Sequence, residues 1–170
     1  DSLRDLVVRR LGQTDHVVVS TGFFREQLAS DLAAHDQFAQ TFEAAVPLIV
    51  LEGFVTDQRG ERRASGVRVY AVDDRFWRFH HLDQIAPPAG NDALLSEGLA
   101  GEIAATPGQS VLLRIETASP IPTESLHGRK EDVGRTIRLT VREVLPAEKL
   151  GEFSLSPQQG SIRAIFVPLR

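Results

Sequence analysis

The chain of 170 residues contains no cysteine and no methionine. The absence of cysteine excludes disulfide bonds, thiolate ligands to a metal ion and cysteine nucleophiles. It also fits an oxidising compartment, where a free thiol is a liability. Because methionine is absent even at position 1 and the last residues read as a strand, we expect the chain to be a fragment of a longer protein.

The chain also lacks a long hydrophobic run and an excess of basic residues. The longest apolar run, residues 44–51, contains Pro47 and is far shorter than the ~20 residues of a membrane-spanning helix. The net charge of −4 argues against nucleic acid as a partner, because nucleic-acid binding requires a cationic surface. The composition is that of a globular chain with a core of its own.

The pattern of apolar residues predicts an α+β fold with a mixed or antiparallel sheet and two or three helices. Helical spacing predicts helices over residues 2–11, 21–35 and 97–105, the last of them capped by Ser96. Strand-like runs cover residues 16–20, 46–56, 65–73, 110–116, 135–145 and 161–169. The second and third of these runs predict a hairpin with Gly60 in its turn.

The run from Gly66 to Asp83 gathers the residues most able to carry chemistry. Asp73 and Asp74 could share a proton or bind a metal ion, because two close carboxylates raise one pKa. Adjacent residues of a strand point to opposite faces, however, so the sequence favours a strand end where one aspartate caps the next turn. This interpretation makes the pair part of the scaffold.

The side chains of the neighbouring histidines are likewise expected to point away from each other. Metal-binding pairs on helices usually lie four residues apart, whereas His80 and His81 are neighbours whose side chains diverge. His16, His35 and His127 have no partner at ligand spacing. We therefore expect no catalytic residue, no metal ligand and no cofactor in this chain.

Two further features could contact a partner. Phe76, Trp77 and Phe79 could form an exposed platform, but aromatic residues directly after a strand more often close the end of a core. The polar stretch at residues 117–134 is predicted to be an exposed loop, and it lacks the glycine–lysine pattern of a phosphate loop. Its candidate partner-binding residues are His127, Arg129 and Lys130.

The order of the segments 66–79, 93–115 and 137–145 resembles the extracytoplasmic core domain of MacB-like permeases, in the FtsX superfamily of ABC transporters. The resemblance covers about residues 15–145. The residues that match the family's motifs are Val72, Asp73, Phe76, Leu99, Ala100, Gly108, Val111, Leu113, Leu139, Val141 and Val144. Within this set and beside it, we assign a structural role in turn and core to Asp73, Phe76, Trp77, Leu99 and Gly108.

The resemblance implies a division of the chain. Residues 1–14 would be a stalk helix that continues a membrane helix, and residues 15–86 would be a porter-like α/β subdomain. Residues 87–170 would be a second, smaller, β-rich part of the Sabre-like α+β type. We place the boundary at Pro87 and Pro88 because prolines and the following glycine interrupt regular structure.

The implied function is not enzymatic. The chain would be the periplasmic domain of an inner-membrane permease, transmitting the work of a cytoplasmic ATPase to an external substrate or to a periplasmic accessory protein, in a parent permease that is dimeric. Two alternatives stay open at this point. One is a ligand- or peptide-binding module that uses the loop at residues 118–134 or an exposed strand edge, and the other is a metal-dependent hydrolase that uses Asp73, Asp74 and His80 or His81.

Overall fold

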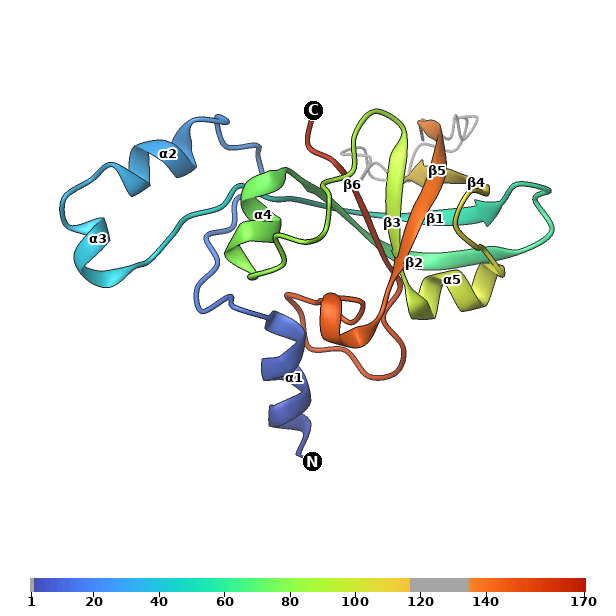
Figure 1. Ribbon diagram of the computed structural model, residues 1–170, viewed down its shortest axis with the longest axis horizontal. Helices are drawn as coiled ribbons and strands as arrows, with labels where there is room; N and C mark the ends of the chain where they lie inside the picture. Colours follow the sequence, from blue (N-terminus) through green and yellow to red (C-terminus); the bar gives the residue numbers. More distant parts are fainter. Residues whose placement is uncertain (1, 117–134) are drawn as a thin grey trace, which may run out of the picture.

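The computed structural model describes residues 2–116 and 135–170, and its central feature is a closed β-barrel (Figure 1). The strands follow one another around the barrel in the order β1–β2–β6–β3–β5–β4, with β4 returning to β1. The pairs β2–β6 and β3–β5 are parallel and the other pairs are antiparallel. The bounds are β1 Ile49–Asp57, β2 Arg63–Val72, β3 Asp92–Ser96, β4 Ser110–Ile115, β5 Thr136–Leu145 and β6 Ala164–Pro168.

Short helices surround the barrel. Helix α1 extends away from the strands at the bottom of Figure 1, while α2 and α3 lie on an excursion to the left of them. Helix α4 follows β2 directly, and α5 follows β3 directly. The bounds are α1 Leu3–Leu11, α2 Leu28–Ala33, α3 Phe38–Thr41, α4 Asp74–Phe79 and α5 Glu97–Ile103, with a 3₁₀ turn, η1, at Ala147–Lys149.

The fold class expected from the sequence is wrong. Instead of an α+β sheet in a porter-like part with a smaller Sabre-like part, the strands form one closed mixed barrel. The hairpin β1–β2 was predicted, but the pairing of β1 with β4 joins segments far apart in the chain. Periodicity within a strand identifies the strand and says nothing about a distant partner, so closure left no local signal.

Closure of the barrel depends on Gly53. A Cβ atom at this position would lie 2.3 Å from the main-chain oxygen of Arg114 on β4. The register of β1 against β2 also shifts between Gly53 and Val55, as at a β-bulge. A glycine therefore lets β1 bend and approach β4 closely enough to complete the ring, which is a recurrent use of glycine in barrels.

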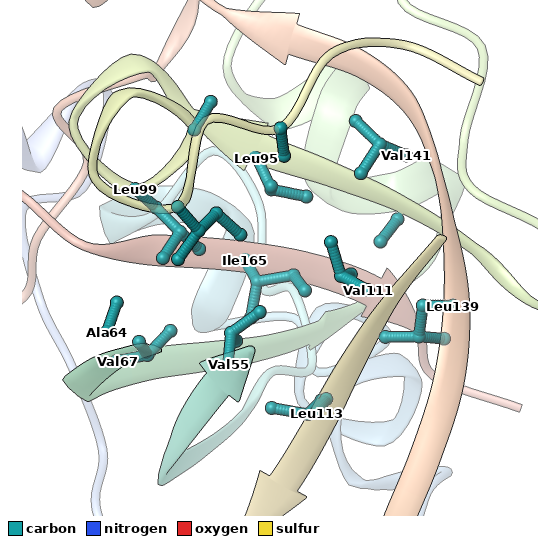
Figure 2. Close-up of a cluster of buried hydrophobic side chains, with 14 of the residues drawn as sticks. Val55, Ala64, Val67, Leu95, Leu99, Val111, Leu113, Leu139, Val141 and Ile165 are labelled. Atoms are coloured by element: carbon teal, nitrogen blue, oxygen red, sulfur yellow. The ribbon is translucent and has the colours of Figure 1, made fainter. Parts of the chain in front are cut away.

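The apolar core has two parts. The first fills the barrel and takes residues from all six strands and from α5, including Val55, Leu99 and Ile165 (Figure 2). The second lies outside the barrel wall, where Trp77 on α4 and Phe153 cover the outer face of β2, β3 and β6. Strand β3, the first part of β6 and residues 69–72 at the end of β2 are thus buried on both faces, which explains the consecutive apolar residues there.

Most predicted elements are confirmed, and the exceptions cluster before β1. The helix at residues 2–11, the β1–β2 hairpin and the helix capped by Ser96 are present. The strand expected at residues 16–20 is wrong, and the helix expected at residues 21–35 is reduced to α2. The expected division between residues 86 and 87 lies in the loop between α4 and β3, and strands from both sides of it pair in the barrel.

Candidate functional site: the junction of helix α1 with the barrel

Asp73 and Asp74 each pair with an arginine. Asp73 caps α4, with its carboxylate accepting from the backbone N–H of Arg75 at 3.0 Å and lying 2.7 Å from the guanidinium Nη2 of the same residue. The hydrogen bond to Asp73 raises the pKa of Arg75. Asp74 lies 2.7 Å from Arg78, one turn further along the helix. Each carboxylate therefore forms an ion pair with its own arginine, and the two carboxylates do not form a pair with each other.

His80 is buried and points toward the end of α1. Its side chain is 7% exposed, and its Nδ1 accepts a hydrogen bond from the backbone N–H of Gln13 at 3.2 Å. Burial, with a smaller effect of His81, lowers the pKa of His80 to about 4. The ring is therefore neutral at pH 7 and serves as an acceptor.

The residues assigned to turn and core, apart from Asp73, lie in three places. Phe76 and Trp77 are buried in the second cluster, and the ring of Trp77 lies 5.4 Å from that of Phe166. Leu99 is buried inside the barrel. Gly108 has a φ of 91° and donates its N–H to the carbonyl of Val141 at 2.7 Å, in the turn before β4.

The structure does not bring the remaining candidates together. His127, Arg129 and Lys130 lie outside the described residues. Within residues 2–116 and 135–170, no group of three histidine, cysteine, aspartate or glutamate side chains is arranged to hold a metal ion. The carboxylates and imidazoles of residues 73–81 therefore lack the convergence that the hydrolase hypothesis requires.

Arg10, on the last turn of α1, makes the most buried charged contact of the described residues. Its side chain is 5% exposed. Nη1 donates to the carbonyl of Gln158 at 2.6 Å and Nη2 donates to the carbonyl of Gly160 at 2.8 Å. The backbone N–H of Ser154 donates in turn to the carbonyl of Arg10 at 3.0 Å, so side chain and main chain of one residue hold the same segment.

The electrostatics of Arg10 favour a fixed side chain. Its only neighbouring acid among the described ion pairs is Glu152, whose carboxylate lies 3.8 Å from Nε and is half exposed. Nε itself is buried without a hydrogen-bond partner in the part of the chain that the structure describes. A buried guanidinium is costly unless its donors are satisfied, so the two carbonyl bonds determine where this side chain lies.

The chain leaves α1 through a contact that only glycine permits. Gly12 ends the helix with a φ of 59°, and a Cβ atom there would lie 2.5 Å from Nδ1 of His80. The next residue, Gln13, then donates its N–H to the same nitrogen. The end of α1, Gly12 and the imidazole of His80 are therefore in close contact. We call this region the junction and define it as Arg10, Gly12, Gln13, His80 and residues 150–160.

The junction was missed in the sequence, although a signal for Arg10 was present. Arg10 follows Leu6 by four residues and Val7 by three, so it lies on the apolar face of the predicted helix. A single arginine on such a face indicates a buried partner that can accept hydrogen bonds. No local pattern identifies the acceptors, because the carbonyls of Gln158 and Gly160 lie about 150 residues further along the chain.

A second feature is an open groove of about 730 Å³ between α2, α4, residues 87–90 and the end of β6. Its charged side chains are already paired with one another: Asp73 with Arg75, Asp74 with Arg78, and Glu26 with Arg170. A charged ligand would have to displace an existing ion pair. The groove is therefore a weaker candidate than the junction.

None of the helices among the described residues is long and apolar enough to cross a bilayer. No protein-family model matches the chain, and no curated protein matches it either.

Proposed function

We propose that this chain is the extracytoplasmic domain of an ABC transporter permease of the MacB-like type, and that it transmits movement without catalysing a reaction. The proposal joins the motif resemblance at residues 66–145 to one structural observation. Helix α1 is held to the segment that leads into β6 by two part-buried hydrogen bonds from the buried side chain of Arg10. A helix that transmits movement must be fixed to the domain at its C-terminal end. Otherwise the helix would tilt without moving the domain.

The route from α1 to the barrel is short. Arg10 holds residues 158–160, which lead into Ile162 and β6. The hydroxyl of Ser96 donates to the carbonyl of Ile162 at 2.8 Å, and the Oγ of Ser96 accepts from the backbone N–H of Ala164 at 3.0 Å. Strand β6 lies between β2 and β3 in the barrel, so a pull on residues 158–160 reaches the whole sheet.

In this proposal the parent permease supplies what the chain lacks. A membrane helix would continue into α1, a cytoplasmic ATPase would drive it, and two permeases would act as a dimer. A periplasmic accessory protein would receive the movement. The domain itself would hold its shape while it shifts, which suits a closed barrel because every strand has two neighbours.

The first test is the gene. If the full coding sequence has no membrane helix next to residue 1, the proposal is abandoned. If it has one, the parent permease is reconstituted in nanodiscs with its ATPase, and a spin label is attached to a cysteine introduced at Arg59, an exposed turn position in a chain without native cysteine. We expect ATP to change the distance between the labels of the two permeases.

The decisive variant is Arg10→Ala, with Arg4→Ala as its matched control. Arg4 is an exposed arginine on the same helix, so its removal changes the charge equally and leaves the junction intact. We expect Arg10→Ala to abolish the ATP-dependent change in label distance while ATP hydrolysis continues, and Arg4→Ala to preserve both. An unchanged response in Arg10→Ala would contradict the proposed route.

A further inference from the structure

Residues 13–48, between α1 and β1, form a segment that we call the arm. It carries α2 and α3 and extends to the side of the barrel (Figure 1). The described chain has ten exposed large hydrophobic side chains, and seven of them belong to the arm, so the exposure is concentrated there. They are Val17, Val18, Val19, Phe23, Phe24, Leu32 and Phe42, with Val19 83% and Phe23 81% exposed.

Clustering on this scale differs from the scattered apolar residues of an ordinary surface. Contiguous exposed apolar side chains commonly mark a surface that binds a partner. The arm returns to the barrel through Val46 and Leu48, which pack against the second core cluster. Its ends are thus anchored, and the apolar side chains between them are presented outward.

The arm also carries the charge of the chain. It contains five acidic residues and one arginine, so its net charge is −4, equal to that of the whole chain, and the other residues balance. Arg25 pairs with Asp31 at 2.7 Å within the arm. Asp15, Asp36 and Glu43 are exposed and form no ion pair among the described residues. The arm therefore combines exposed apolar side chains with a net negative charge.

The backbone of residues 16–19 narrows the choice of occupant. This segment belongs to no helix or strand, and its N–H and C=O groups have no hydrogen-bond partner within residues 2–116 and 135–170. Water can satisfy these groups in the free protein, but hydrocarbon cannot. A protein partner can satisfy them by adding a strand alongside, with pockets for alternate valines.

Charge excludes two other occupants. The acidic residues of the arm would repel an anionic bilayer, whose surface attracts basic segments. A second copy of the chain would bring a second arm of the same sign and a remainder without net charge. We propose that the arm is a docking site for a protein partner whose contact surface is both apolar and basic.

The inference goes beyond the proposed transport role and does not need it. Its test uses the chain as it stands and a fluorescein-labelled peptide of alternating lysine and valine, which supplies an apolar face, basic charge and a free strand edge. A peptide of alternating glutamate and valine keeps the apolar face and reverses the charge. A peptide of alternating lysine and serine keeps the charge and removes the apolar face.

Fluorescence anisotropy measures binding of each peptide at low and at high salt. We expect the lysine–valine peptide to bind at least tenfold more tightly than either comparison peptide, and to weaken as salt rises. The double variant Val17→Ser/Val19→Ser should lose at least tenfold in affinity, because both side chains are exposed and the fold does not need them. Leu3→Ser is the matched control, since Leu3 is 70% exposed on α1, between the values of Val17 and Val19, and its replacement should leave binding unchanged.

Several results would overturn the proposal. The arm would not be a site for a basic partner if the lysine–valine peptide did not bind, or if the glutamate–valine peptide bound with the same affinity. The same conclusion would follow if Leu3→Ser lost as much affinity for the lysine–valine peptide as Val17→Ser/Val19→Ser. Dimerisation in sedimentation velocity that Val17→Ser/Val19→Ser abolishes would make a second copy the occupant. Binding to phosphatidylcholine vesicles with or without phosphatidylglycerol, lost in the same variant, would make it a lipid surface. None of these results bears on the role of Arg10, so this test and that of the transport proposal fail separately.

Discussion

The barrel and the arm contain the same kinds of apolar residue and place them in opposite environments. Val55 and Val67 are fully buried in the barrel, whereas Val18 and Val19 are among the most exposed valines of the arm. Trp77 is 1% exposed on the outer wall of the barrel, while Phe23 in the arm is 81% exposed. Residue type therefore predicts little about burial here, and the availability of a neighbouring strand or helix decides it.

The difference is one of hydrogen bonding as well as packing. Each barrel strand has a partner on both sides, so its backbone groups are paired and its side chains meet a second layer. The arm has no such partner strand among the described residues, and seven of its large apolar side chains remain exposed to water. Substitutions in the barrel should therefore cost several kcal/mol in unfolding free energy and equivalent substitutions in the arm almost nothing.

The largest effect is expected at Trp77. Replacing Trp77 by alanine should lower the free energy of unfolding by about 4 kcal/mol, because it removes the largest buried side chain and leaves a cavity against Phe76 and Phe166. Urea unfolding followed by circular dichroism measures the loss. A change below about 1 kcal/mol would show that the outer cluster contributes far less than its burial indicates.

The next effect is expected at Gly53. Gly53→Ala should lower the free energy of unfolding by about 2–3 kcal/mol, because the new methyl group meets the main-chain oxygen of Arg114, and a backbone cannot swing away as a side chain does. Gly60→Ala serves as the control. It has a positive φ in the β1–β2 turn but open space around it, so only the smaller conformational cost applies. Equal losses of unfolding free energy in both variants would show that closure of the barrel does not depend on glycine at position 53.

An effect of pH is expected at His80. The pKa of His80 is about 4 in the folded chain and about 6.5 in the unfolded chain. Between pH 4 and pH 6.5, the imidazole is therefore protonated in the unfolded state and neutral in the native state. Stability should be full above pH 6.5 and fall by about 2 kcal/mol as the pH drops toward 4. The His80→Phe variant should lack this part of the pH dependence. An identical pH profile for both proteins would mean that the imidazole does not titrate as its burial predicts.

The smallest effect is expected in the arm. Phe23→Ala should change the free energy of unfolding by less than about 0.5 kcal/mol, because the ring is in water in the folded state as it is in the unfolded one. Thermal melting next to Trp77→Ala gives the direct comparison. A loss similar to that of Trp77→Ala would show that the arm packs as the barrel does.

Elements with local signals were predictable. Ser96 accepts from the N–H of Leu99 at 3.3 Å as a helix cap should, and α1 ends at Leu11 as predicted. The β1–β2 hairpin follows from two β-branched runs around a polar turn. By contrast, residues 16–20 have the valines of a strand and form none, because a strand also needs a partner and the barrel is complete without them.

The candidate site shows the same limit more sharply. The chemical residues of the Gly66–Asp83 run were found in the sequence, but their pairing with arginines and the contact of His80 with Gln13 were not. Arg10 could be placed on the apolar face of α1 from its spacing alone. The acceptors of its hydrogen bonds could not be predicted, because they are backbone carbonyls and every residue has one.

The order of residues along this chain sufficed for the end of α1, the start of α5, the β1–β2 turn and most of the strands, because caps, steric preferences and side-chain alternation act over a few neighbours. Closure of the sheet, burial of β3, β6 and the end of β2 on both faces, and attachment of α1 through Arg10 arise from contacts between distant segments. Such contacts form only when the folded chain brings the segments together, and no short pattern of residues encodes which pairs will meet.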